Sequence, residues 1–102
     1  MGPLAAVSSF AKVGKHAIVH IHSSVGHDVR VGDYSAILPG ARLSGKAQLG
    51  QRVLVGSNSF IAASVDIGDD CQIDALTYVQ HDLPTGHIAS VRTKRPVRRV
   101  DL

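Results

Sequence analysis

The chain has 102 residues, a length that suits one domain. Its composition is 44% apolar but only 4% aromatic, with no Trp, so a core must be built from Val, Ile, Leu and Ala. No apolar run approaches the roughly 20 residues of a membrane span, and the first residues lack the basic leader and apolar block of a signal peptide. The single cysteine, Cys71, has no internal partner for a disulfide, which fits a cytoplasmic protein.

The net charge of +3 is concentrated at the C-terminus. Residues 1–91 contain six Lys or Arg and seven Asp, whereas residues 92–102 contain five Lys or Arg and one Asp. A basic tail of this kind either contacts the phosphates of a nucleotide, a nucleic acid or a membrane, or is simply a solvated end. We expect no nucleic acid and no membrane among the partners.

A six-residue repeat runs through residues 7–84 without an insertion or a deletion. The first position of every repeat is Val, Ile or Leu: Val7, Val13, Val19, Val25, Val31, Ile37, Leu43, Leu49, Val55, Ile61, Ile67, Ile73 and Val79. The fifth position is small or β-branched in twelve of the thirteen repeats: Ala11, Ala17, Ser23, Val29, Ser35, Ala41, Ala47, Val53, Ser59, Val65, Cys71 and Thr77, with Leu83 as the exception.

This period fits neither an amphipathic helix nor a plain strand. It predicts a short strand followed by a turn, with three such units closing a triangular coil of 18 residues. The first position should point inward, and the small fifth position should fit the corner. We attribute the Gly at six of the second positions to the backbone angles that glycine permits.

Thirteen repeats give just over four coils, stacked as parallel strands at about 4.8 Å per coil. Each coil then covers only its neighbours. Pro84 and Gly86 mark a turn where the period ends. We therefore divide the chain into a lead-in (residues 1–6), a parallel β-helix (residues 7–84) and a basic C-terminal arm (residues 85–102).

The stretch 25–46, VGHDVRVGDYSAILPGARLSGK, holds an adjacent His27–Asp28 pair within unbroken repeats. His27 occupies the third position of its repeat and should project from the surface. Residues 18 apart should stack in one column, which contains Ser9, His27, Gly45, Ala63 and His81. Gly45 would then lie about 5 Å from His27 along the axis. His27 is a candidate general base with Asp28 orienting its ring, and an ordinary surface histidine is the alternative.

The repeats resemble those of the hexapeptide-repeat acyltransferases, which form a left-handed parallel β-helix despite the general preference for right-handed crossovers. The likeness is closer to the sugar acetyltransferases of the sialic-acid and bacillosamine type. Their H-[DE]-x-x-[IV]-G-[DE] segment is matched by His27-Asp28-Val29-Arg30-Val31-Gly32-Asp33. Further matches are Leu38-Pro39-Gly40, Leu43-Ser44-Gly45-Lys46 and Val79-Gln80-His81-Asp82-Leu83-Pro84.

This resemblance implies acetyl transfer from acetyl-CoA to an amino or hydroxyl group of a sugar or nucleotide-sugar, in a ternary complex without a covalent enzyme intermediate. It assigns the general base to His27 and the oxyanion donor to the backbone N–H of Gly45. It also implies a homotrimer, with the cofactor in the cleft between adjacent β-helices and with no metal. The positions expected beside acetyl-CoA are Gly45, Ala36, Ser57, Ala63 and Ala75.

Several features depart from the family pattern. The N-terminal nucleotide-sugar domain of those enzymes has no counterpart in this sequence. The histidine that often lies near the cofactor, nine positions after the base, is Ala36 here. The Gly-Ala-Gly of the family is Asp74-Ala75-Leu76, and the closing G-x-P-A-[KR] segment is the glycine-free sequence of residues 93–98.

Two alternative functions stay open at this point. A γ-type carbonic anhydrase uses the same fold, and His22 and His27 have its H-x4-H spacing. A zinc site needs three protein ligands. The third histidine of that family lies at least one coil upstream, and no histidine precedes His16 here. A truncated, non-catalytic relative is the other alternative, favoured by Asp74 and Leu76. The remaining expectations are surface positions for His16, His20, His22 and His87, a structural or cofactor-proximal His81, and a core position for Cys71.

Overall fold

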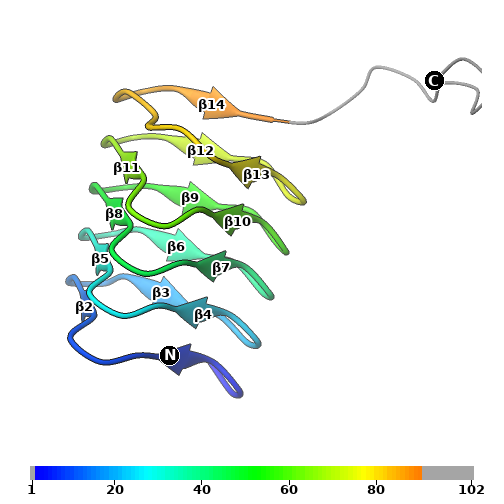
Figure 1. Ribbon diagram of the computed structural model, residues 1–102. Coiled ribbons are helices and arrows are strands. Elements are labelled where there is room, and N and C mark those ends of the chain that lie inside the picture. Colours follow the sequence, from blue (N-terminus) through cyan, green and yellow to red (C-terminus); the bar gives the residue numbers. More distant parts are fainter. Residues whose placement is uncertain (1, 91–102) are drawn as a thin grey trace, which may run out of the picture.

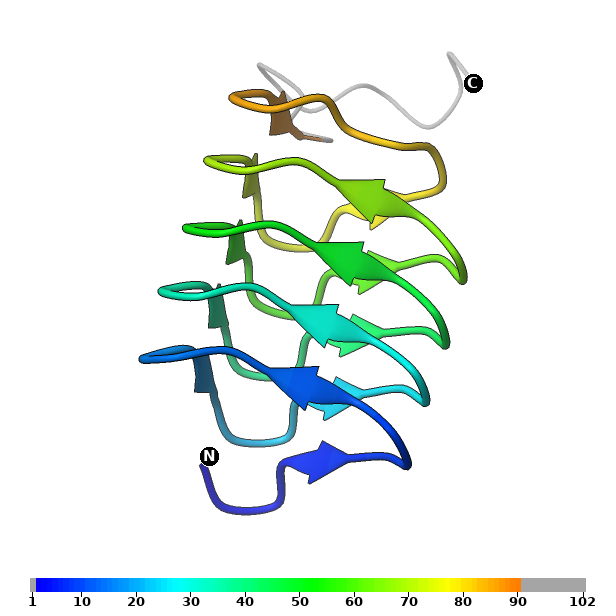
Figure 2. The same ribbon diagram turned by 90° about the vertical axis from the view of Figure 1, so that its left-hand side faces the viewer.

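Fourteen two-residue strands wind into a triangular prism over residues 2–90, the part of the chain that the computed structural model describes (Figures 1 and 2). The first sheet stacks β1 (Ala6–Val7), β4 (Ser24–Val25), β7 (Arg42–Leu43), β10 (Phe60–Ile61) and β13 (Tyr78–Val79). The second stacks β2 (Lys12–Val13), β5 (Arg30–Val31), β8 (Gln48–Leu49) and β11 (Asp66–Ile67). The third stacks β3 (Ile18–Val19), β6 (Ala36–Ile37), β9 (Leu54–Val55), β12 (Gln72–Ile73) and β14 (Ile88–Ala89).

The stacking follows the predicted period. All strand pairs are parallel, and every pair from β1 to β13 joins residues 18 apart, as in Val7↔Val25 and Val25↔Leu43. Three repeats therefore make one coil, and the stack has about five coils. Within residues 2–90, we find no helix of the length and apolar character that a membrane crossing requires.

The interior consists of the two repeat positions that the sequence indicated. First positions from Val19 to Val79 and fifth positions from Ser23 to Thr77 are buried, including Cys71, which is 2% exposed. Val7 and Val13 are exposed because they belong to the terminal coil, which has a neighbour on one side only. The buried Ser hydroxyls donate to backbone carbonyls, as Ser35 Oγ does to the oxygen of Gly50 at 2.9 Å.

Each corner is turned by the fourth residue of a repeat. From Leu4 to Leu76, this residue has a φ between 55° and 77°, in the left-handed region, whatever its side chain. In most corners the fifth residue donates its N–H to the carbonyl of the second, as Ala47 does to Ser44 at 3.3 Å. A positive φ at the third of four turn residues is the geometry of a type II turn. The repeat thus imposes the left-handed region even on large residues such as Phe10 and Tyr34.

The expected role of the second-position glycines was wrong. None of them has a positive φ. Instead, each lies directly beneath the backbone of the next coil, so a side chain would collide with it. A Cβ on Gly56 would lie 2.6 Å from the carbonyl carbon of Asp74 and 2.7 Å from the oxygen of Ile73. These glycines permit close stacking, and the unusual backbone angles belong to the fourth position.

The period shortens by two residues in the last coil. Leu83 pairs with Ile67, and β14 pairs with β12 through Gln72↔Ile88, at separations of 16. Leu83 therefore stands over a first position, and its assignment to a fifth position was wrong. β14 stacks on the prism, although it lies in the segment assigned to a C-terminal arm. The basic stretch 92–102 lies outside the described residues.

Candidate active site

The predicted column lies at the corner where the chain passes from the first sheet to the second. Backbone hydrogen bonds join its members along the axis. Asp28 N–H donates to the oxygen of Ser9 at 3.1 Å, Lys46 N–H to that of His27 at 2.8 Å, and Ser64 N–H to that of Gly45 at 3.0 Å. His27 and Gly45 are thus neighbours one coil apart.

The imidazole of His27 covers Gly45. A Cβ built on Gly45 would overlap Nε2 of this ring and lie 2.7 Å from Cε1 and 2.8 Å from Cδ2. These separations are far below the 3.5–4.0 Å of ordinary carbon contacts. Only glycine leaves this space for the ring, and its φ is not in the left-handed region. Gly45 is required here for a close approach between a backbone and a side chain.

The carboxylate of Asp28 holds the other side of the ring. Nδ1 of His27 lies 3.2 Å from Oδ2 of Asp28, and the two side chains are 61% and 50% exposed. Adjacent side chains on a strand point apart, but Asp28 is the corner residue with φ 57°, which allows the pair to meet. Because an ionised carboxylate only accepts hydrogen bonds, Nδ1 must carry the proton. In the neutral ring, Nε2, above Gly45, then carries no proton and can accept one.

The backbone N–H of Gly45 has no acceptor among the hydrogen bonds of residues 2–90. The amides of Ser44 and Lys46, on either side, both donate to carbonyls. One unused donor therefore lies beside one proton acceptor. A pair of this kind can remove a proton from a nucleophile and stabilise the negative charge that develops on a carbonyl oxygen.

The other positions expected at the cofactor do not all gather here. Ala63 follows Gly45 in the same column. Ala36 lies in β6 on the third sheet, and Ser57 and Ala75 lie at the corner between the third and first sheets. Within one prism, these three positions are separated from His27. His81 belongs to the shortened segment at the end of the column.

Other predicted surface histidines stay apart from this corner. His16, His22 and His87 are exposed and His20 is half-buried. His22 follows the third sheet, whereas His27 follows the first, so the two lie at different corners. In the described part of the chain, no three His, Cys, Asp or Glu side chains are grouped to hold a metal ion.

The sequence analysis did not predict two hydrogen bonds that Gln48 makes beside the candidate base. The Nε2 of Gln48 donates to the oxygens of Asp28, at 3.3 Å, and Lys46, at 3.2 Å, and so ties two coils of this corner together. The sequence feature that could have indicated these hydrogen bonds was a polar residue at an outward-facing strand position of the adjoining sheet.

Farther away, Arg52 donates to Asp70 at 2.6 and 3.1 Å, and this hydrogen bonding lowers the pKa of Asp70 and raises that of Arg52.

The fold and this corner define the class: a left-handed parallel β-helix of hexapeptide repeats with a His–Asp pair on its surface. No family model matches the chain. Serine acetyltransferase of Helicobacter pylori (strain 26695) is 33% identical over 89 residues, covering 78% of this chain and 52% of the relative. GDP-perosamine N-acetyltransferase of Escherichia coli O157:H7 is 29% identical over 65 residues, covering 64% of this chain and 29% of the relative.

A solved structure agrees with the fold. PerB from Caulobacter crescentus, in complex with CoA and GDP-perosamine, superposes with a TM-score of 0.73 at 24% identity, covering 84% of this chain and 50% of that one. The repeat and the fold are thus similar to those of hexapeptide-repeat acyltransferases, and the relatives that the sequence matches are acetyltransferases. The chain spans about half the length of the serine acetyltransferase that it matches.

Proposed function

We propose that this chain forms the β-helix of an acetyl-CoA-dependent acetyltransferase that acts on an amino or hydroxyl group of a sugar or nucleotide-sugar. The observation that carries the proposal is the corner at His27. A histidine whose Nδ1 is held by Asp28 presents Nε2 directly above a glycine whose N–H is unused. The relatives named for acetyl transfer, one to serine and one to GDP-perosamine, support the reaction class.

The chain's own residues would act as follows. Nε2 of His27 takes the proton from the acceptor's nitrogen or oxygen as that atom forms a bond to the acetyl carbon. The N–H of Gly45 donates to the acetyl oxygen while it bears negative charge. Acetyl-CoA supplies the activated acetyl group and a thiol leaving group, and the proton held by His27 returns to the sulfur as the carbon–sulfur bond breaks. Asp28 keeps the ring in the tautomer that this requires.

The corner at His27 and Gly45 is open to solvent, as binding of acetyl-CoA requires. The ring of His27 is 61% exposed, and Gly45 carries no side chain that would block a thioester. We infer a homotrimer with the cofactor between adjacent prisms, because Ala36, Ser57 and Ala75 belong to other faces than Gly45 and would line one cofactor with it only if two prisms lie side by side. The exposed apolar side chains of Ile18 and Leu54 on the third sheet, 49% and 37% exposed, support such an association.

The decisive experiment is CoA release by the full chain with a panel of amino-sugar nucleotides. His27→Ala should fold normally, since its side chain is exposed, and should lower kcat by about 10²–10⁴, the usual contribution of a positioned base. Asp28→Asn should have a smaller effect. His87→Ala, which removes another exposed histidine, serves as the control. Turnover at the wild-type rate by a folded His27→Ala variant would exclude the mechanism.

A non-catalytic β-helix is the second candidate. It is favoured by Leu76, which is 71% exposed and stands where the family has a glycine. A thermal-shift titration with acetyl-CoA separates the two candidates. A rise in Tm with cofactor concentration supports the enzyme, and an unchanged Tm together with no CoA release supports the non-catalytic role.

A further inference from the structure

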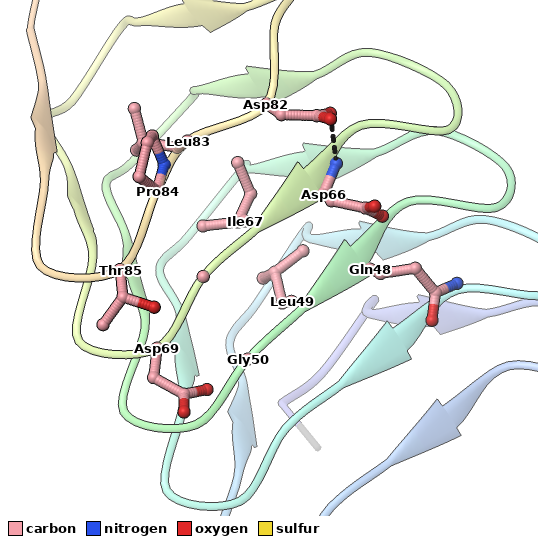
Figure 3. Close-up of a pocket in the computed structure, with 11 residues that line it drawn as sticks. Gln48, Leu49, Gly50, Asp66, Ile67, Asp69, Asp82, Leu83, Pro84 and Thr85 are labelled. Carbon is pink, nitrogen blue, oxygen red and sulfur yellow. Dashed lines mark hydrogen bonds between the residues drawn. The ribbon is translucent and has the colours of Figure 1, made fainter.

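Gln48 differs from the residues above and below it on the second sheet. It is the first residue of β8, and the outward residues of the other three strands are all charged and exposed: Lys12, Arg30 and Asp66. Gln48 is half-buried. It lines one side of a hollow of about 520 Å³, and Figure 3 shows its amide on the side away from Pro84. The amide is thus directed to the corner that holds His27 and not to the last coil.

The side-chain amide of Gln48 donates to backbone carbonyls in two successive coils. Its Nε2 lies 3.3 Å from the oxygen of Asp28 and 3.2 Å from the oxygen of Lys46. A primary amide has two N–H donors, so one group can serve both oxygens. Among the hydrogen bonds of residues 2–90, no backbone N–H donates to either oxygen. Gln48 therefore supplies donors that the β-helix itself does not provide at this corner.

Both carbonyls belong to residues that turn the corner. Asp28 and Lys46 have φ of 57° and 65°, in the left-handed region, which is unfavourable for a residue that carries a side chain. Such a conformation persists only where the surrounding structure holds it. A hydrogen bond to the carbonyl of the turn residue restrains the peptide that follows that residue. One side chain thus restrains the turn after His27 and the turn after Gly45.

The turn at Asp28 decides how the candidate base is oriented. The left-handed φ of Asp28 brings its Oδ2 to 3.2 Å from Nδ1 of His27. Both side chains are at least half exposed, so their contact depends on the backbone more than on packing. Without this contact, Nδ1 would lose the acceptor that keeps its proton, and the ring would also populate the tautomer protonated at Nε2. In that tautomer, Nε2 cannot act as a base.

We propose that Gln48 is a positioning residue: its amide holds the turn at Asp28 against the coil of Gly45, and so keeps Nε2 of His27 unprotonated above that glycine. Gln48 acts through Asp28 and His27, because its amide bonds to carbonyls of the protein. Its effect on a reaction rate rests on the proposed function. Its effect on the tautomer of His27 is a property of the corner and can be measured without a substrate.

NMR of the full chain with isotope-labelled histidine tests this role. At alkaline pH, where imidazole is neutral, the nitrogen chemical shifts of His27 report which ring nitrogen carries the proton. His27→Ala identifies these signals. We expect the proton on Nδ1 in the wild type and a mixture of both tautomers in Gln48→Met, which keeps the side-chain length and removes both donors. Gln48→Glu, whose ionised carboxylate has the same shape but no donor, should give the same mixture.

Gln72→Met is the matched control for the NMR experiment. Gln72 begins β12 at the same repeat position, but its amide donates to Oδ1 of Asp74 on its own coil, at 3.1 Å. This change should leave the tautomer of His27 as in the wild type. A His27 tautomer that Gln48→Met does not change, or that Gln72→Met changes equally, overturns the proposal.

Kinetics separate this role from the proposed function. In CoA release with amino-sugar nucleotides, kcat of Gln48→Met should fall about tenfold, less than the about 10²-fold effect of a 1 Å misplacement. KM for acetyl-CoA should stay unchanged, because Gln48 bonds to the protein and not to the cofactor. A Gln48→Met variant that urea unfolding shows to be folded, and that has the wild-type kcat, overturns the role.

The two measurements fail independently. Acetyl transfer by a chain whose His27 tautomer does not depend on Gln48 overturns the positioning role alone. A Gln48-dependent tautomer in a chain that transfers no acetyl group overturns the proposed function alone.

Discussion

Replacing Gly45 with Ala tests the geometry of the candidate site without removing any of its functional groups. The added Cβ would overlap Nε2 of His27 and approach Cε1 at 2.7 Å. Since carbon contacts normally lie at 3.5–4.0 Å, the ring must move by about 1 Å. A displacement of this size at a reacting group lowers the rate by about 10²-fold. We therefore expect kcat to fall by about that factor.

The same substitution should leave stability almost unchanged. The obstructing atoms belong to an exposed side chain that can swing into solvent, and φ at Gly45 suits an L-residue. We expect the free energy of unfolding to change by less than about 0.5 kcal/mol. The assays are CoA release with a thiol reagent and urea unfolding. In a His27→Ala background, Gly45→Ala should cause no further loss, because the two changes act on one group. Full activity of Gly45→Ala, or an equal loss in both backgrounds, would refute the reasoning.

Three further predictions concern the prism itself. Ile61→Ala removes a fully buried side chain and should destabilise the protein by about 2–5 kcal/mol in urea unfolding; an unchanged midpoint would contradict the inward register. Gly56→Ala should lower stability by about 1–3 kcal/mol, unlike Gly45→Ala, because its Cβ meets rigid backbone, and an unaltered Tm would show that the coils can separate. The hydrogen bond from Arg52 is the main cause of the lowered pKa of Asp70. The ionised Asp70 therefore stabilises the fold at pH values above the ordinary carboxyl pKa, and this stabilisation is lost as the pH falls through the lowered pKa. Urea unfolding from neutral to acid pH should show that Asp70→Asn lacks this part of the pH dependence.

The candidate site was only partly predictable from the chain. Stacking of His27 and Gly45 followed from the 18-residue spacing alone, because parallel coils in register place such residues one above the other. The contact between His27 and Asp28 did not follow from it, since adjacent residues on a strand point apart. It depends on the left-handed backbone of Asp28, and the sequence pattern wrongly suggested that the unusual angles belong to the second-position glycines.

The sequence by itself determined the architecture of this protein. A strict six-residue period with Val, Ile or Leu at the first position leaves one way to bury those side chains, which is a three-sided coil stacked on copies of itself. Tertiary structure decided what the surface of that prism can do. The shortened last coil at Leu83 and the unused N–H of Gly45 both depend on how one coil meets the next. Those contacts join residues 16 to 18 positions apart and are settled by backbone approach, which the period of apolar side chains does not specify.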